Sequence, residues 1–115
     1  ALEIMDGDAI TDSAEAFYLM RQRGITNVIV MGVHINMCVL GRPFAIRAMA
    51  QQGRDVALLR DLTDTMYNSQ MRPKVNHFAG TDLVIEHVEK YWCPTFTSAD
   101  LVGGSPFKFK EDLRP

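Results

Sequence analysis

The chain has 115 residues, of which 47% are hydrophobic and 23% are charged, and its net charge is −2. These values are typical of one globular domain with a hydrophobic core. A charge this close to zero gives no basic surface for nucleic acid, and no apolar run is long enough to cross a membrane. The composition therefore predicts that neither nucleic acid nor a membrane is a partner.

Cys38 and Cys93 are the two cysteines, and they lie far apart in the sequence. Neither belongs to a Cys-x-x-Cys or Cys/His ligand spacing, so we expect reduced thiols and neither a disulfide framework nor a structural zinc site. No signal peptide is visible, and the cytoplasm is the default location. Because the chain opens on Ala1 and not on methionine, we expect the natural amino terminus to be missing.

The hydrophobic pattern predicts helices that alternate with strands. A possible short strand at 2–5 precedes a helix at 13–23, which Asp12 caps while Glu15 reaches back to it. The continuous apolar run at 26–31 predicts a parallel strand that is covered on both faces.

A loop at 34–36 leads into a second predicted helix at 37–52, and a second buried strand follows at 55–60. Together these elements form a right-handed βαβ unit with parallel strands. Cys38 and Asp61 then lie at the carboxyl edge of the sheet, where open α/β sheets keep their sites.

The polar segment 62–76 predicts a surface loop beside the same edge, where it can form one wall of a pocket. A third helix is expected at 81–92, followed by a short edge strand at 93–97. Residues 1–104 would belong to one domain. Residues 105–115 would form a tail of doubtful order.

Two aromatic residues of this tail, Phe107 and Phe109, alternate with lysines. We expect them to dock either on the body of the domain or on a partner, if the tail is ordered.

Cys38 follows the first buried strand and its loop directly. Free N–H groups and the positive end of the helix dipole favour a thiolate at a helix start, so Cys38 is a candidate nucleophile. The same local pattern fits a small core thiol, which is the commoner outcome because free cysteines are mostly buried and inert.

Other site chemistries fit the pattern less well. The loop after Gly32 lacks Gly-x-Gly-x-x-Gly and Gly-Lys-Ser/Thr, which disfavours nucleotide binding. His34 lies four residues before Cys38 and is expected as a pocket wall or surface group more than as a general base. His77 and His87 are expected on a helix surface or partly buried.

The run 30–39 reads Val-Met-Gly-Val-His-Ile-Asn-Met-Cys-Val and is followed by Gly53 and by Val-Ala-Leu-Leu-Arg-Asp at 56–61. These residues, and the order of the elements, resemble the carboxyl-terminal half of the isochorismatase-like cysteine hydrolases. The longer runs 32–44 and 86–95 look like a bacterial branch of that superfamily. The resemblance implies a three-layer, Rossmann-like parallel sheet with helices on both faces, truncated at its amino-terminal side.

The resemblance also implies an activity. In amidohydrolase members an aspartate, a lysine and a cysteine form the catalytic triad, and Cys38 matches the cysteine. It would attack a small amide or related C–N bond and form an acyl-enzyme. The Val33–His34 peptide bond would be the family's cis bond, and the N–H groups of His34 and Cys38 would form the oxyanion hole. The substrate would also contact Ile35, Asn36, Met37 and Arg42.

This sequence departs from the family pattern at two places. Ile35 stands where threonine is usual, and Arg42-Pro43 replaces the usual Thr-Ala after the nucleophile. A proline inside a helix removes an N–H donor, so the helix must bend near Val39 or restart with Pro43 as its first residue. Arg42 would then either hold an anionic substrate group or lie in solvent or against a partner. Asp61 matches a family aspartate that we interpret as structural.

The general-base aspartate, the lysine and the metal ligands of the nicotinamidases come from the family's amino-terminal half, and no residue here matches them. We therefore expect this chain to supply the cysteine half of a site, to bind no cofactor or metal, and to be inactive alone. A homo-oligomer is the expected assembly. The alternatives are a non-catalytic α/β module that associates through an open sheet edge, and a thiol sensor that uses Cys38 reversibly.

Overall fold

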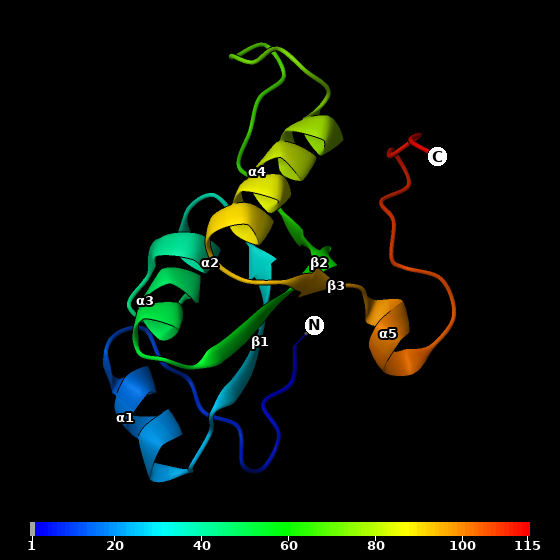
Figure 1. Ribbon diagram of the computed structural model, residues 1–115. Helices are drawn as coiled ribbons and strands as arrows, with labels where there is room; N and C mark the ends of the chain where they lie inside the picture. Colours follow the sequence, from blue (N-terminus) through cyan, green and yellow to red (C-terminus); the bar gives the residue numbers. More distant parts are fainter. Residues whose placement is uncertain (1) are drawn as a thin grey trace.

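A computed structural model describes residues 2–115 and contains three strands that form one parallel sheet (Figure 1). β1 (Asn27–Val33) pairs with β2 (Asp55–Asp64), and β2 pairs with β3 (Thr95–Phe96). Five helices accompany these strands among the described residues: α1 (Glu15–Gln22), α2 (Cys38–Gly41), α3 (Ile46–Gln51), α4 (His77–Tyr91) and α5 (Ser98–Val102). The chain is a small α/β domain, as its hydrophobic pattern predicts.

The first helix begins two residues after its expected start, with Ala14 and not Asp12 as its N-cap, and it ends one residue before its expected end. Glu15 reaches back as expected, because its side chain accepts a hydrogen bond of 2.9 Å from the backbone N–H of Asp12. This bond and a second one from Ser13 lower the pKa of Glu15. The possible strand at 2–5 does not form.

The expected helix at 37–52 is two helices, because the segment between Gly41 and Ile46 is not helical. Arg42 has φ −70° and ψ 159°, an extended conformation that a following proline favours. The chain therefore leaves the helix one residue before Pro43. It becomes helical again only at Ile46, so the expectation of a restart at Pro43 is wrong.

The hydrophobic core lies between one face of the sheet and the helices α2, α3 and α4. Strand residues Val56 and Leu58 pack in it with residues of all three helices, with Ile35 and with Cys93. On the other face of β1, Ile29, Met31 and Val33 expose 47%, 54% and 60% of their surface. The described chain thus covers one face of β1 and leaves alternate residues of the other open.

β2 continues four residues beyond its expected end at Arg60. The pairing with β1 is irregular between Val30 and Gly32, and it then resumes with Gly32 opposite Thr63 and Val33 opposite Asp64. This register brings the carboxyl ends of both strands together, and the loops that leave them lie side by side.

α4 begins at His77, four residues before the helix that the sequence predicts. The side chain of Asn76 accepts a hydrogen bond of 2.9 Å from the backbone N–H of Phe78 and so caps the helix. The short helix α5 was not expected; a capping box formed by Thr97 and Asp100 starts it.

The tail docks on the body of the domain, which is one of the two expected outcomes. The rings of Phe109 and Phe78 stack with their centroids 5.9 Å apart. Arg114 forms ion pairs with Asp82 of α4 and with Asp112 of the tail itself. Figure 1 shows the tail returning beside the upper part of the sheet and α4.

Asp61 ties the beginning of this tail to β2. Its carboxylate accepts hydrogen bonds from the backbone N–H and the hydroxyl of Ser98, and from the backbone N–H of Phe107. Partial burial opposes ionisation, but these bonds outweigh it and lower the pKa of Asp61. The contacts fit the structural role that we expected for this aspartate.

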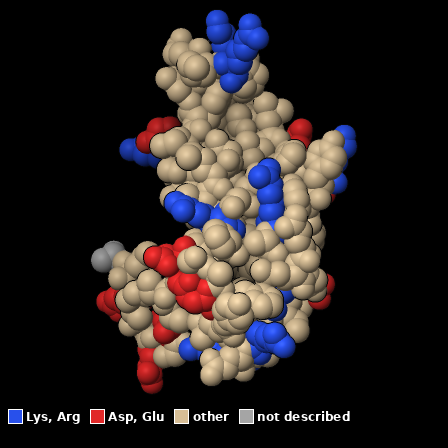
Figure 2. All heavy atoms as spheres, turned by 90° about the vertical axis from the view of Figure 1, so that its left-hand side faces the viewer, with Lys and Arg blue, Asp and Glu red and all other residues tan. Residues whose placement is uncertain are grey.

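On the face shown in Figure 2, most of the Asp and Glu side chains lie in the lower left part, whereas Lys and Arg side chains lie at several separate places. The Lys and Arg side chains at its top belong to the loop that precedes α4, where Arg72 and Lys74 are exposed, and the other basic groups on this face lie apart from them. No helix of the described residues has the length and apolar character needed to cross a membrane.

Candidate functional site at the carboxyl ends of β1 and β2

The loop that follows β1 delivers Cys38 to the first position of α2. The carbonyl oxygen of His34 accepts hydrogen bonds from the backbone N–H groups of Met37, at 3.0 Å, and Val39, at 3.1 Å. These two bonds close a tight turn. Cys38 itself is half-buried, so its thiol is neither a core group nor fully in solvent.

The peptide bond between Val33 and His34 is cis, as the resemblance implies. The backbone N–H groups of His34 and Cys38 donate no hydrogen bond to any residue of the described chain. Two donors of one short turn are therefore left without a protein acceptor, and one of them belongs to the cysteine. An arrangement of this kind can stabilise negative charge on a substrate oxygen.

The four expected substrate contacts lie in different surroundings. Ile35 points into the core and is 0% exposed, so its side chain does not line an open pocket. Met37 and Arg42 are exposed, and the Arg42 side chain makes no hydrogen bond or ion pair with the described residues. Asn36 is exposed, but its side chain is already held by hydrogen bonds within the protein.

Asn36 joins the Cys38 turn to the loop that follows β2. Its Nδ2 donates to the carbonyl of Met66 at 3.1 Å, and its Oδ1 accepts from the N–H of Met66 at 3.0 Å. A third bond runs parallel to these, from the N–H of Ile35 to the carbonyl of Asp64 at 2.8 Å. The amide of Asn36 thus holds the loop in place, and it is not free to bind a substrate group in this conformation.

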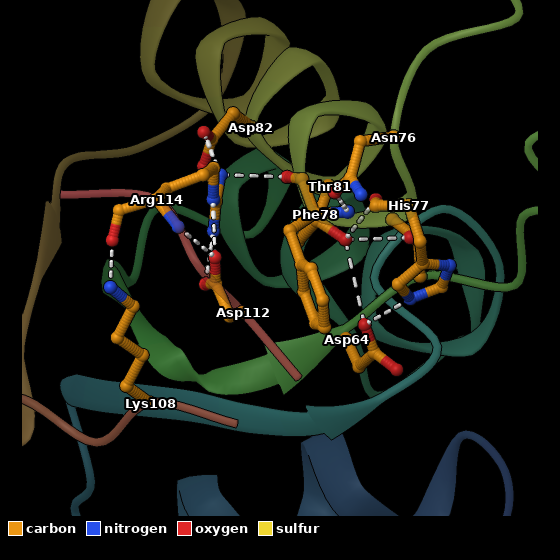
Figure 3. A network of polar contacts seen from close by, with 10 residues as sticks. Asp64, Asn76, His77, Phe78, Thr81, Asp82, Lys108, Asp112 and Arg114 are labelled. Carbon is orange, nitrogen blue, oxygen red and sulfur yellow. Dashed lines mark hydrogen bonds and ion pairs between the residues drawn. The ribbon is translucent and has the colours of Figure 1, made fainter. Parts of the chain in front are cut away.

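A polar cluster that the sequence did not predict lies between the end of β2 and the start of α4 (Figure 3). His77 Nε2 is 2.8 Å from Asp64 Oδ1, and His77 Nδ1 is 2.9 Å from the carbonyl oxygen of Tyr67. The hydroxyls of Thr65 and Thr81 are 2.8 Å apart and buried. Each contact joins the start of α4 to the segment 64–67.

The hydrogen bond with Asp64 is the main cause that raises the pKa of His77, and the bond to the Tyr67 carbonyl adds to it. Sequence reasoning expected His77 on a helix surface or partly buried, and partly buried is what the structure shows. Its contact with Asp64 was missed because β2 was expected to end before Asp64. The sequence signal that could have indicated this contact was a polar residue, Asp64, ahead of a helix start that Asn76 caps.

A cavity of about 670 Å³ lies between the carboxyl half of β2, α4 and the tail. Asp64 and Thr81 line it from the body, and Phe109 and Arg114 line it from the tail. No residue of the segment 33–42 lines it, so this cavity is separate from the Cys38 turn.

Among residues 2–115, no group of three His, Cys, Asp or Glu side chains is placed to hold a metal ion. Comparisons of the chain with family models, with curated proteins and with solved structures found no match.

Proposed function

We propose that this chain supplies the cysteine half of the active site of an isochorismatase-like cysteine hydrolase. The observation that carries the proposal is the turn at 34–38, which contains a half-buried thiol and two backbone N–H groups without acceptors in the described chain. The turn follows a parallel strand at its carboxyl end, where α/β folds place catalytic groups. The residues of the turn are also those that carry the resemblance.

The proposed reaction is the hydrolysis of a small amide or related C–N bond. The thiolate of Cys38 attacks the carbonyl carbon, and the N–H groups of His34 and Cys38 donate hydrogen bonds to the oxygen as its charge develops. The C–N bond then breaks, and the amine leaves with a proton. Water attacks the thioester, releases the acid and restores the thiol.

The base that takes the cysteine proton and the lysine of the triad would come from the part of the fold that this chain does not match. Loss of a general base typically costs 10²–10⁴-fold in rate, so we expect negligible hydrolysis from this chain alone. In the complete fold, helices would cover both faces of the sheet, including the open face of β1 at Ile29 and Met31.

The test measures ammonia or amine release from a panel of small primary amides and carbamoyl compounds by the natural full-length protein. Mass spectrometry of the quenched reaction then locates the acyl group. The Cys38→Ser variant should lose both turnover and the acyl adduct, whereas Cys93→Ser should keep both. Turnover that survives in Cys38→Ser would contradict the proposal.

One observation favours association as a second function. β1 is an edge strand of the described sheet, and Ile29, Met31 and Val33 present an apolar row beside its unpaired backbone. Open edges of this kind pair readily with another strand. A homo-oligomer formed through this edge would sediment above the mass of one chain, and Met31→Lys should return it to the monomer.

A further inference from the structure

The Cys38 turn is shaped by a segment that is remote in sequence. Three hydrogen bonds join residues 35 and 36 to the segment 64–67: one from Ile35 to the carbonyl of Asp64, and two between Asn36 and the backbone of Met66. Any movement of the segment 64–67 must therefore break these bonds or move the turn. The question is what holds this segment itself.

His77 holds it at both ends. Its Nε2 contacts the carboxylate of Asp64, at the first residue of the segment, and its Nδ1 contacts the carbonyl of Tyr67, at the last. Between them, Thr65 bonds to Thr81 in the next turn of α4. The start of α4 therefore clamps the segment at Asp64, Thr65 and Tyr67.

The packing of Tyr67 makes this clamp close-fitting. Its ring stacks on the imidazole of His77 with the centroids 6.4 Å apart, and its hydroxyl accepts a hydrogen bond from the N–H of Val75. A Cβ at Gly80 would lie 2.5 Å from the Tyr67 ring, so only glycine at this position lets the ring approach the helix.

Both of the oxygens that face the imidazole accept hydrogen bonds and have no proton to donate. A neutral imidazole has one N–H, so it can donate to one of the two oxygens only, whereas an imidazolium donates to both. The geometry is therefore that of a protonated His77.

The charged surroundings of His77 are simple. Asp64 faces it from β2 and Tyr67 from the loop, while Thr81 and Phe78 are its neighbours on α4. The ion pairs of Arg114 with Asp82 and Asp112 lie on the far side of the Phe78 ring (Figure 3).

We propose that His77 is a positioning residue for the Cys38 turn: its protonated ring clamps the segment 64–67, and that segment holds residues 34–38 in the conformation that leaves the two N–H groups free. Loss of the ring proton removes one of the two contacts and loosens the turn. As a statement about catalysis this inference rests on the proposed function, but the position of the turn can be measured without turnover.

The test measures hydrogen exchange of the backbone amides of Ile35 and Met66 by NMR, expressed as protection factors, between about pH 5.5 and pH 8.5. Protection should fall about ten-fold as His77 loses its proton, because one charge-assisted hydrogen bond disappears. The amide of Leu58, which bonds to the carbonyl of Pro94 on the central strand, should keep its protection and serves as the internal reference.

Three variants separate the clamp from a general effect on folding. His77→Gln should have low protection at Ile35 and Met66 that no longer depends on pH, whereas His87→Gln, on the exposed side of the same helix, should match the wild type. Asp64→Asn keeps an acceptor but removes the charge, so it should move the pH midpoint down toward the ordinary histidine value near 6.5.

Protection that is independent of pH in the wild type would overturn the inference, as would an unchanged midpoint in Asp64→Asn. The Asp64→Asn and wild-type titrations decide the matter even if His77→Gln does not fold. If amide hydrolysis is found but protection is constant, the proposed function stands and the clamp does not. If protection follows the prediction but no hydrolysis is found, the clamp stands alone.

Discussion

The two cysteines of this chain carry the same thiol in opposite surroundings. Cys93 follows α4, is 7% exposed and packs in the core, where burial raises the pKa of its thiol. Cys38 is half-buried in a turn at the edge of the sheet, and this turn also contains two N–H groups without acceptors in the described chain. The backbone around a lone cysteine thus distinguishes a core thiol from a candidate nucleophile. Its spacing from other cysteines does not.

The largest effect should come from the core anchor of the Cys38 turn. Ile35→Ala removes a fully buried side chain and leaves a cavity under the turn, so it should lower the free energy of unfolding by about 2–5 kcal/mol. Met37→Ala changes an exposed side chain two residues away and should cost less than about 0.5 kcal/mol. Urea denaturation measures both. Equal costs would mean that the turn is not anchored through the core.

A smaller loss of stability should follow when the packing between α4 and the segment 64–67 is made too tight. Gly80→Ala places a methyl group against the Tyr67 ring, and overpacking of this kind costs about 1–3 kcal/mol. This loss should exceed the gain in helix propensity, which is about 1 kcal/mol. The matched control is Gly41→Ala, where nothing lies within 4 Å of the added group. A stabilised Gly80→Ala protein would show that the ring moves freely.

The smallest effect should be confined to the tail, far from both cysteines. Arg114→Gln removes the exposed ion pair with Asp82 and the partly buried one with Asp112, so trypsin should cut after Lys108 and Lys110 a few times faster, by about threefold. The control is Arg47→Gln, since Arg47 packs over Trp92 and not on the tail. A cleavage rate that does not change would show that ring stacking alone holds the tail.

The pH dependence of the tail follows from the same ion pair. The hydrogen bond from Arg114 lowers the pKa of Asp112 to about 2. A lowered pKa stabilises the docked tail fully above the ordinary aspartate value near 3.9, and this stabilisation is lost as the pH falls through about 2. NMR shifts of the Phe109 ring should therefore stay constant from neutral pH down to about pH 4 and change only below it.

Much of the site's framework was readable in the sequence because it depends on local signals. Four apolar residues before Gly32 predict the strand β1, although the expectation that both of its faces are covered is wrong, and the break after it places Cys38 at a helix start. The resemblance supplied the cis bond after Val33, which hydrophobic periodicity cannot show. Pro43 indicated a helix break but not the residue at which the next helix begins, because that position depends on the packing of Ile46 in the core.

The clamp and the ion pairs that hold the docked tail were not readable, because each depends on residues far apart in the chain. The polar residues at the end of β2 look like a loop in the sequence, and only the pairing of Val33 with Asp64 shows that the strand continues. His77 contacts Asp64 across 13 residues, and Arg114 contacts Asp82 across 32. No local pattern predicts such contacts.

The most direct test of the account compares the alkylation of the two cysteines by iodoacetamide in the natural full-length protein, with mass spectrometry to quantify each labelled peptide. Under native conditions Cys38 should be labelled at least about ten-fold faster than Cys93, which should react only when the protein unfolds. Equal rates, or labelling of Cys38 only on unfolding, would make Cys38 a second core thiol and remove the basis for the proposed nucleophile.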